Sequence, residues 1–271
     1  MPRIPGEARG RNLQMLHGKK FVITGVVTTD SIAFATARGV LDLGAEVILT
    51  APERDRERAD QAAVTLGCDL QTLDVNDPDA WAALEVVIRD RWDVLDGALH
   101  AVAYAPVDAL DGDFFAAKRD SLTMAFHTSA ASYASLAGLV ARLAPAGGGS
   151  VVGLDFDAAA AWPTYNWMGV CKAALEATSR YVARDLGPQR VRSNLIAAGP
   201  LETRAALGIP GFSGLLEAWA GQSPIEWDST DPGPVADTAC FLLSDMARAI
   251  TGEIIHVDGG FHAMATALRS P

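Results

Sequence analysis

Short apolar runs rich in valine and isoleucine alternate along this chain with longer alanine-rich stretches, and this rhythm strongly constrains the fold. An apolar run of about four to eight residues fits a strand that is buried on both faces, and a longer amphipathic stretch fits a covering helix. The expected strands lie at 19–25, 45–50, 68–75, 95–104, 149–156, 191–199 and 252–260. The expected helices lie near 31–43, 53–66, 78–92, 120–143, 166–186, 213–220 and 233–247. The alternation predicts an α/β fold, a single-domain, doubly wound parallel sheet of seven strands with helices on both faces.

Two stretches stand outside this rhythm. Residues 1–15 contain prolines and basic residues but no continuous apolar core, so they do not resemble a secretory signal and are expected to form a flexible arm. The single folded domain would then span residues 16–271. The segment "LGIPGFSG" (207–214) interrupts the late part of the chain. We expect it to lie in a loop over the carboxyl edge of the sheet, where folds of this type bind ligands.

Composition excludes several classes of partner. The formal net charge is −11, so general binding to nucleic acid or to an anionic membrane is not expected, because phosphates attract cationic faces. No apolar run approaches the roughly 20 residues of a membrane-spanning helix. The three cysteines form no CxxC pair, which favours reduced thiols in a cytoplasmic protein and no metal site.

The turn after the first strand, "TGVVTTDSIA" (24–33), has the composition of a phosphate-binding turn. A glycine, small polar residues and a helix start present backbone N–H groups to a pyrophosphate, although here Gly25 could equally serve only to relax a tight turn. Asp74 ends the third strand, where it could reach an adenine amino group or cap the helix that begins at Pro78. The small residues of "HAVAYAP" (100–106) would let a flat ring approach the backbone.

A tyrosine and a lysine stand seven residues apart in "PTYNWMGVCKAALEA" (163–177). On a helix this separation is two turns, about 10 Å along one face. Tyr165 could donate its hydroxyl to a carbonyl oxygen that becomes negative when hydride reaches a conjugated carbon, and Lys172 could hold a ribose hydroxyl. The alternative is a tyrosine in the core followed by a solvated surface lysine.

Several segments together resemble one protein family. They are "TGVVTTDSIAF", "LDV", "GSVVGLDFDAAAAWPTYNWMGVCKAALEATSRYVARDLG", "VRSNLIAAGPLET" and "TGEIIHVDGG". They are similar to the NADH-dependent enoyl-[acyl-carrier-protein] reductases of type II fatty acid synthesis. This Rossmann-fold family is a divergent branch of the short-chain dehydrogenases/reductases, and the chain looks closest to the actinobacterial type that includes the isoniazid target. The resemblance runs from about residue 16 to 264, and its Gly-x5-Ser turn and Tyr-x6-Lys pair are specific to this branch.

The resemblance implies a mechanism and a set of site residues. NADH would deliver hydride to the β-carbon of a trans-2-enoyl thioester, Tyr165 would stabilise the enolate, and Phe156 would pack beside the nicotinamide and the thioester. The residues implied for the cofactor are Gly25, Ser31, Ile32, Asp74, Val75, Ala101, Lys172 and Thr203. Candidate walls of the substrate pocket are Tyr104, Phe156, Met168 and Trp219. For Met168 and Trp219, ordinary core packing is an equal alternative. Residues 204–220 would form the mobile substrate-binding loop.

Three residues depart from the family's pattern. The family usually has "HSIGF" or "HSIGY" where this chain has "HAVAY", so Ala101 lacks a hydroxyl and Ala103 adds a methyl near the cofactor. Glu202 stands where an arginine is common, and a carboxylate there would oppose anion binding unless it pointed away. These changes leave open a reductase of another conjugated or carbonyl substrate in a specialised pathway, or a non-catalytic dinucleotide-binding paralogue.

Cofactor and partner choices also remain open in the sequence. The second strand ends in "TAPERDR", without an acidic residue at its tip, and Arg54 or Arg56 could accept a 2′-phosphate, so NADH is favoured and NADPH is not excluded. The substrate carrier is expected to be acyl carrier protein, which would need a local basic cluster around Arg204, or coenzyme A. By resemblance, the assembly is expected to be a homotetramer.

Overall fold

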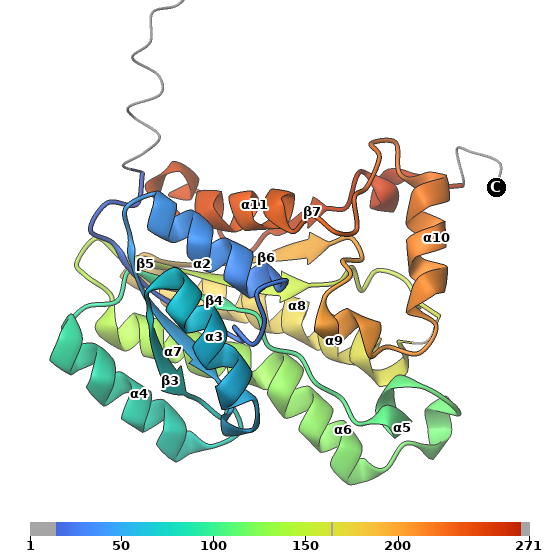
Figure 1. Ribbon diagram of the computed structural model, residues 1–271, viewed down its shortest axis with the longest axis horizontal. Coiled ribbons are helices and arrows are strands. Elements are labelled where there is room, and N and C mark those ends of the chain that lie inside the picture. Colours follow the sequence, from blue (N-terminus) through green and yellow to red (C-terminus); the bar gives the residue numbers. More distant parts are fainter. Residues whose placement is uncertain (1–14, 164, 267–271) are drawn as a thin grey trace, which may run out of the picture.

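The computed structural model describes residues 15–163 and 165–266, and a parallel sheet forms its centre (Figure 1). The sheet has seven strands in the order β3-β2-β1-β4-β5-β6-β7. The strands are β1 (Lys20–Thr24), β2 (Glu46–Ala51), β3 (Asp69–Thr72), β4 (Gly97–His100), β5 (Gly149–Asp155), β6 (Val191–Ala198) and β7 (Ile254–Val257). The predicted fold class is confirmed, and each strand lies within or close to its expected range. The expected arm falls outside the described residues except for its last position, residue 15.

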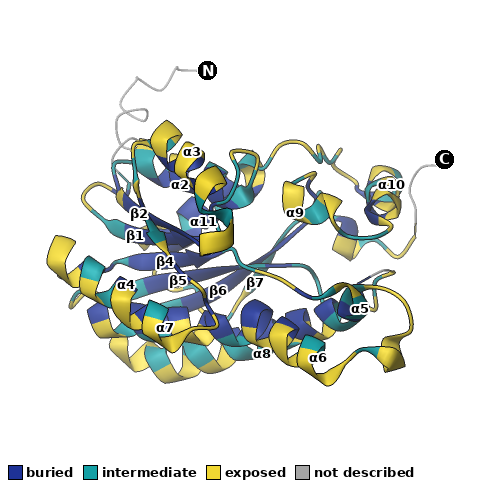
Figure 2. Cartoon of the chain, turned by 60° about the horizontal axis from the view of Figure 1, so that its bottom comes forward, coloured by how far each residue is buried: buried dark blue, intermediate teal, exposed yellow. Residues whose placement is uncertain are grey.

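Helices cover both faces of the sheet (Figure 2). One layer contains α2 (Ile32–Asp42), α3 (Arg56–Leu66) and α11 (Gly233–Leu243). The other layer contains α4 (Pro78–Arg91), α7 (Ser132–Leu143) and α8 (Asn166–Leu186). The order of the strands reverses between β1 and β4, which is where doubly wound sheets open a crevice for ligands at the carboxyl ends of their strands.

The expected long helix at 120–143 is interrupted. It consists of α6 (Arg119–Phe126), a π-helical turn (His127–Ala131) and α7. The turn brings hydroxyl groups to the end of β4, because Ser129 Oγ accepts a hydrogen bond from the backbone N–H of Tyr104 (3.0 Å) and donates one to its carbonyl oxygen (3.1 Å). Such π turns are frequent at functional sites.

Further helices gather at the carboxyl end of the sheet (Figure 1). They are α5 (Val107–Leu110), α9 (Arg204–Leu207) and α10 (Phe212–Gln222). The segment 207–214, expected to lie in a loop, is only partly irregular: its first residue ends α9, residues 208–211 form the connection, and its last three residues begin α10. None of the helices in the described ranges is both long and apolar enough to cross a membrane.

His100 makes the stability of this fold dependent on pH. Its ring is fully buried at the end of β4, with Nε2 2.8 Å from Ser132 Oγ, and burial lowers the pKa of His100 from 6.5 to about 3. The unfolded chain therefore binds a proton that the folded protein rejects, and this contribution to stability is present above pH 6.5 and is lost as the pH falls.

We expect the stability advantage of the wild type over His100→Gln to shrink between pH 6.5 and pH 4 by at most about 1.4 kcal/mol per pH unit. Urea unfolding of both proteins at several pH values measures this difference. Because other titrating groups act equally in both proteins, a difference that does not vary with pH would contradict the buried neutral histidine.

Candidate active site

Three adjoining cavities form one cleft along the carboxyl edge of the sheet. The first cavity, about 50 Å³, is lined by residues that include Thr50, Asp74 and Thr128. A middle cavity of about 390 Å³ includes Gly25 and Arg54, which it shares with the first. An apolar cavity of about 500 Å³ shares Ile32, Lys172 and Thr203 with the middle one. The cleft therefore runs without interruption from Asp74 to the neighbourhood of Tyr165.

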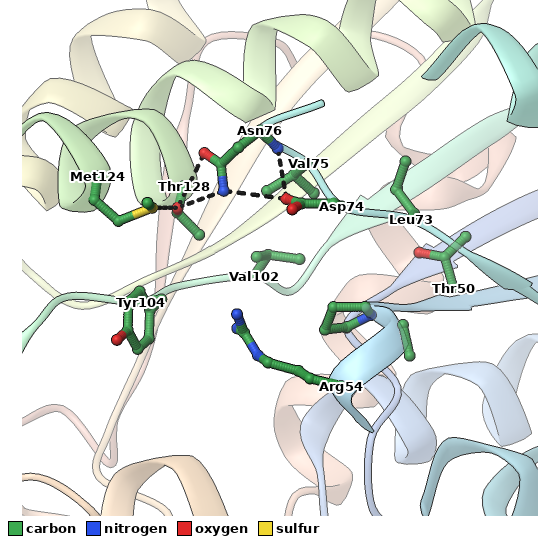
Figure 3. Close-up of a pocket in the computed structure, with 13 residues that line it drawn as sticks. Thr50, Arg54, Leu73, Asp74, Val75, Asn76, Val102, Tyr104, Met124 and Thr128 are labelled. Carbon is green, nitrogen blue, oxygen red and sulfur yellow. Dashed lines mark hydrogen bonds between the residues drawn. The ribbon is translucent and has the colours of Figure 1, made fainter. Parts of the chain in front are cut away.

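Asp74 is held at the wall of the first cavity by its neighbour Asn76 (Figure 3). Its Oδ1 accepts hydrogen bonds from the backbone N–H (2.9 Å) and the side-chain amide (3.2 Å) of Asn76, and that amide also donates to Thr128 Oγ1 (3.0 Å). The helix cap is a different residue, since Asp77 accepts the N-terminal hydrogen bond of α4. Asp74 is thus free of the capping role that the sequence allowed, and Val75 beside it lines the same cavity.

Arg54 and Arg56 have different environments. The guanidinium of Arg54 lies 5.3 Å from the ring centroid of Tyr104, on the wall shared by the first and middle cavities (Figure 3). Arg56 instead pairs with Asp60 (3.2 Å) and donates to Thr72 (2.9 Å) at the protein surface. Only Arg54 of these two is among the lining residues of the cleft.

The turn after β1 requires a glycine. Gly25 has a φ of +74°, and a Cβ at this position would overlap the carbonyl oxygen of Ala101 after the neighbouring strand β4. Ser31 then caps α2 by accepting a hydrogen bond from the N–H of Phe34 (3.1 Å). Ser31 and Ile32 both line the middle cavity, so the positive end of the α2 dipole opens onto it.

The three positions that depart from the family's pattern can now be placed relative to the cleft. Ala101 lines the middle cavity, and Ala103 is exposed on the walls of the middle and apolar cavities rather than packed beneath them. Glu202 is directed away, because its Oε1 accepts a hydrogen bond from Ser229 Oγ (2.6 Å) and it is absent from the described lining of the cleft. Thr203 caps α9 and lines both cavities, so the electrostatic conflict expected from Glu202 does not arise in this geometry.

Tyr165, Lys172 and Phe156 meet at the wall of the apolar cavity. Tyr165 is the residue before α8 rather than part of it, yet its side chain and that of Lys172 line the same space. The ring centroids of Phe156 and Tyr165 lie 5.1 Å apart. Lys172 is only 5% exposed and donates from Nζ to the carbonyl oxygen of Leu154 (2.9 Å), so the alternative of a solvated surface lysine is wrong.

Burial determines the charge states at this junction. It raises the pKa of Tyr165 far above its usual value, which keeps the phenol protonated and able to donate at neutral pH. Burial also lowers the pKa of Lys172, whereas the nearby Asp155 carboxyl acts to raise it. The pair can offer a neutral hydroxyl donor and, while Lys172 carries its proton, a cationic donor to one bound molecule.

The three remaining pocket candidates, Tyr104, Met168 and Trp219, lie at different depths. Met168 and Tyr104 line the apolar cavity, together with Phe212 from α10. Trp219 is not among its lining residues and packs behind Phe156, with ring centroids 5.8 Å apart and a close face-to-face stack on Phe261 (3.7 Å). The lining set also contains residues that the sequence did not indicate, among them Leu110, Leu154 and Asp155, and it includes Ile209 and Leu215 from the expected substrate-binding loop. Their signal was weak, since residues at the end of a buried strand or in a short helix look like ordinary core positions.

Comparisons with known proteins agree on one family. The family model described as "Enoyl-(Acyl carrier protein) reductase" matches residues 25–262. The NADH enoyl-[acyl-carrier-protein] reductase of Mycobacterium avium is 40% identical over 91% of this chain and 97% of its own length. The Bacillus cereus enzyme of that name is 37% identical over 93% and 100%, and the Staphylococcus aureus relative, named as NADPH-dependent, is 36% identical over 92% and 98%. The chain belongs to the enoyl-[acyl-carrier-protein] reductase family.

Proposed function

We propose that this protein reduces the trans-2 double bond of an enoyl thioester carried by acyl carrier protein, with NADH as the hydride donor. The observation that carries the proposal is the junction of Tyr165, Lys172 and Phe156 at the meeting point of the middle and apolar cavities, in a chain of this family. NADH is the cofactor in the names of most of the similar relatives, including the mycobacterial one.

The cleft has the donor set that a dinucleotide needs. The N-terminus of α2 and the close approach of the Gly25 turn to the backbone of Ala101 suit a diphosphate in the middle cavity. Asp74 and Val75 would hold the adenine end in the first cavity, and Thr203 would contact a phosphate from the other side. Lys172, at the junction, would hold the nicotinamide ribose.

Tyr165 and Lys172 would divide the electrostatic work of the reaction. Bound NADH supplies the hydride for the β-carbon of the enoyl group. The Tyr165 hydroxyl, held protonated by burial, would donate a hydrogen bond to the thioester oxygen as it becomes an enolate oxygen. The Lys172 ammonium would stabilise the same negative charge from a short distance, and a proton from solvent would complete the reduction at the α-carbon.

The apolar cavity suits the acyl chain. Apolar side chains dominate its lining, including Met168, Phe212 and Leu215, and the α9–α10 segment forms one wall. We propose that residues 204–220 are the substrate-binding loop and that Phe156 orients the thioester. Exposed Arg204 at the rim of the middle cavity is available to an acidic carrier. The protein is further proposed to act in the cytoplasm as a homotetramer.

Cofactor choice gives a test of Arg54. NADH is expected to be the better substrate, and any turnover with NADPH should depend on Arg54, whose guanidinium faces the cleft. Arg54→Gln should therefore lower kcat/KM for NADPH by about 10-fold, the value of one charge-assisted hydrogen bond, and change that for NADH much less. The matched control is Arg56→Gln, which should affect neither, and equal losses for both nucleotides would contradict this role.

The function itself is tested by following NADH oxidation at 340 nm with crotonyl and dodecenoyl thioesters of acyl carrier protein and of coenzyme A. Turnover with the carrier-protein thioester supports the proposal, and turnover with only the coenzyme A thioester would change the assigned carrier. Calorimetric binding of NADH without reduction of any of these thioesters would contradict it and would favour a non-catalytic nucleotide-binding protein.

A further inference from the structure

A buried carboxylate without a partner stands between two residues of the candidate active site. Asp155 is the last residue of β5, where it pairs in register with Ala197 of β6. The carbonyl of the preceding Leu154 accepts the hydrogen bond from Lys172, and the ring of the following Phe156 faces Tyr165. Asp155 itself is 5% exposed, and neither carboxylate oxygen has a hydrogen-bond partner among the described residues.

Such a group needs a reason to be present. A carboxylate removed from water without hydrogen bonds is costly, and most buried polar groups in native proteins are paired. Two acidic residues nearby do have partners. Glu176 on α8 accepts a hydrogen bond from the backbone N–H of Ala158 (3.2 Å), and Asp157 Oδ2 lies 3.7 Å from His256 Nε2. Unlike these two residues, Asp155 has no hydrogen-bond partner among the described residues. It lines the same apolar cavity as Lys172.

Among the charged groups that act on the pKa of Asp155, Lys172 is the cation. Burial raises the pKa of Asp155 to about 7, Lys172 acts to lower it, and Glu176 and Asp157 raise it further. The effect is mutual, because Asp155 acts to raise the pKa of Lys172 against the lowering caused by burial. Two buried groups of opposite charge therefore each favour the ionised form of the other.

We propose that Asp155 is a positioning residue for Lys172: its buried carboxylate supplies the counter-charge that keeps the lysine an ammonium ion, held toward the cleft through the adjacent Leu154 carbonyl. The inference rests on the nucleotide-binding part of the proposed function. Within 15–163 and 165–266, Lys172 Nζ donates one hydrogen bond, so its other N–H groups remain for a ligand at the junction of the middle and apolar cavities. Asp155 acts on that ligand only through the charge of the lysine.

The expected signature is a shift in the pH dependence of NADH binding. In the wild type, the dissociation constant should stay low until Lys172 loses its proton as the pH rises. In Asp155→Asn, the side chain keeps its shape but has no charge, so the weakening should begin at least about one pH unit lower. At a pH between the two transitions, the variant should bind NADH roughly 10-fold more weakly, whereas at pH 6 the two proteins should agree within about threefold.

The experiment is a calorimetric titration with NADH from pH 6 to pH 10 on wild type, Asp155→Asn and the control Asp157→Asn, with thermal unfolding recorded at each pH. The control removes a neighbouring carboxylate that already has a partner, so its profile should follow the wild type. Parallel profiles for all three proteins would overturn the proposal. A failure of nucleotide binding altogether would appear as no binding by the wild type, which is a different outcome.

A reciprocal measurement needs neither NADH nor the Asp155 variant. The carboxyl carbon of Asp155 is followed by ¹³C NMR in wild type and in Lys172→Met as the pH is changed. If Lys172 is the opposing charge, its removal should move the titration of Asp155 upward from about 7. An unchanged midpoint would overturn the proposal even if Asp155→Asn does not fold.

Discussion

Lys172→Met should weaken NADH binding by at least about 100-fold, the largest effect expected of a single substitution in this protein. The ammonium is buried at the junction of the middle and apolar cavities, where hydrogen bonds to a charged donor contribute about 1.5–3 kcal/mol each. Two such bonds to ribose oxygens account for a loss of this size. Methionine keeps the apolar stem of the side chain, and Asp155 can take up a proton once its counter-charge is removed, so the fold should survive.

Calorimetry at pH 7 measures the dissociation constant, and thermal unfolding checks the fold. Lys118→Met serves as the matched control, since Lys118 is exposed before α6 and is absent from the described lining of the cleft. A Lys172→Met protein that binds NADH within about threefold of the wild type would contradict the placement of the ribose beside this lysine.

Tyr165→Phe should lower kcat for enoyl reduction by about 10- to 100-fold while leaving NADH affinity nearly unchanged. The substitution removes one hydrogen bond to a developing oxyanion, an interaction of about 1.5–3 kcal/mol, and retains the ring that packs against Phe156. The loss is expected to be incomplete, because the charge of Lys172 still acts on the enolate oxygen.

Steady-state rates with a carrier-protein thioester, together with the NADH dissociation constant, separate these effects. A fall in NADH affinity equal to the fall in kcat would show that the phenol binds the nucleotide instead. Met168→Leu is a suitable control, because it changes another lining residue without altering any hydrogen-bonding group.

The strand pattern was readable from sequence because most of the strands are apolar runs buried on both faces, the edge strands β3 and β7 being less buried. The runs that begin at Lys20 and Gly149 have this form, and their helical neighbours show the complementary pattern. The order of the strands and the crevice between β1 and β4 follow from the doubly wound topology. Gly25 was also readable, although its close approach to Ala101 depends on a strand far away in the chain.

Other features depend on contacts that a sequence does not display. The break between α6 and α7 is such a case, because Ser129 bonds to the backbone of Tyr104 and nothing in the local pattern signals a π turn. Asp155 ends a strand that the sequence predicts, but only the folded structure shows that its carboxylate is buried without a hydrogen-bond partner among the described residues. Glu202 looked unfavourable until its bond to Ser229 was seen.

Hydride transfer to the β-carbon is tested most directly with NADH that carries deuterium in the transferred position of the nicotinamide ring. The enzyme is incubated with a trans-2-enoyl thioester, and the product is analysed by mass spectrometry and NMR. The account predicts a saturated acyl thioester with one deuterium at the β-carbon, and the α-carbon proton taken from water. Unchanged enoyl thioester, or deuterium at the α-carbon, would contradict it.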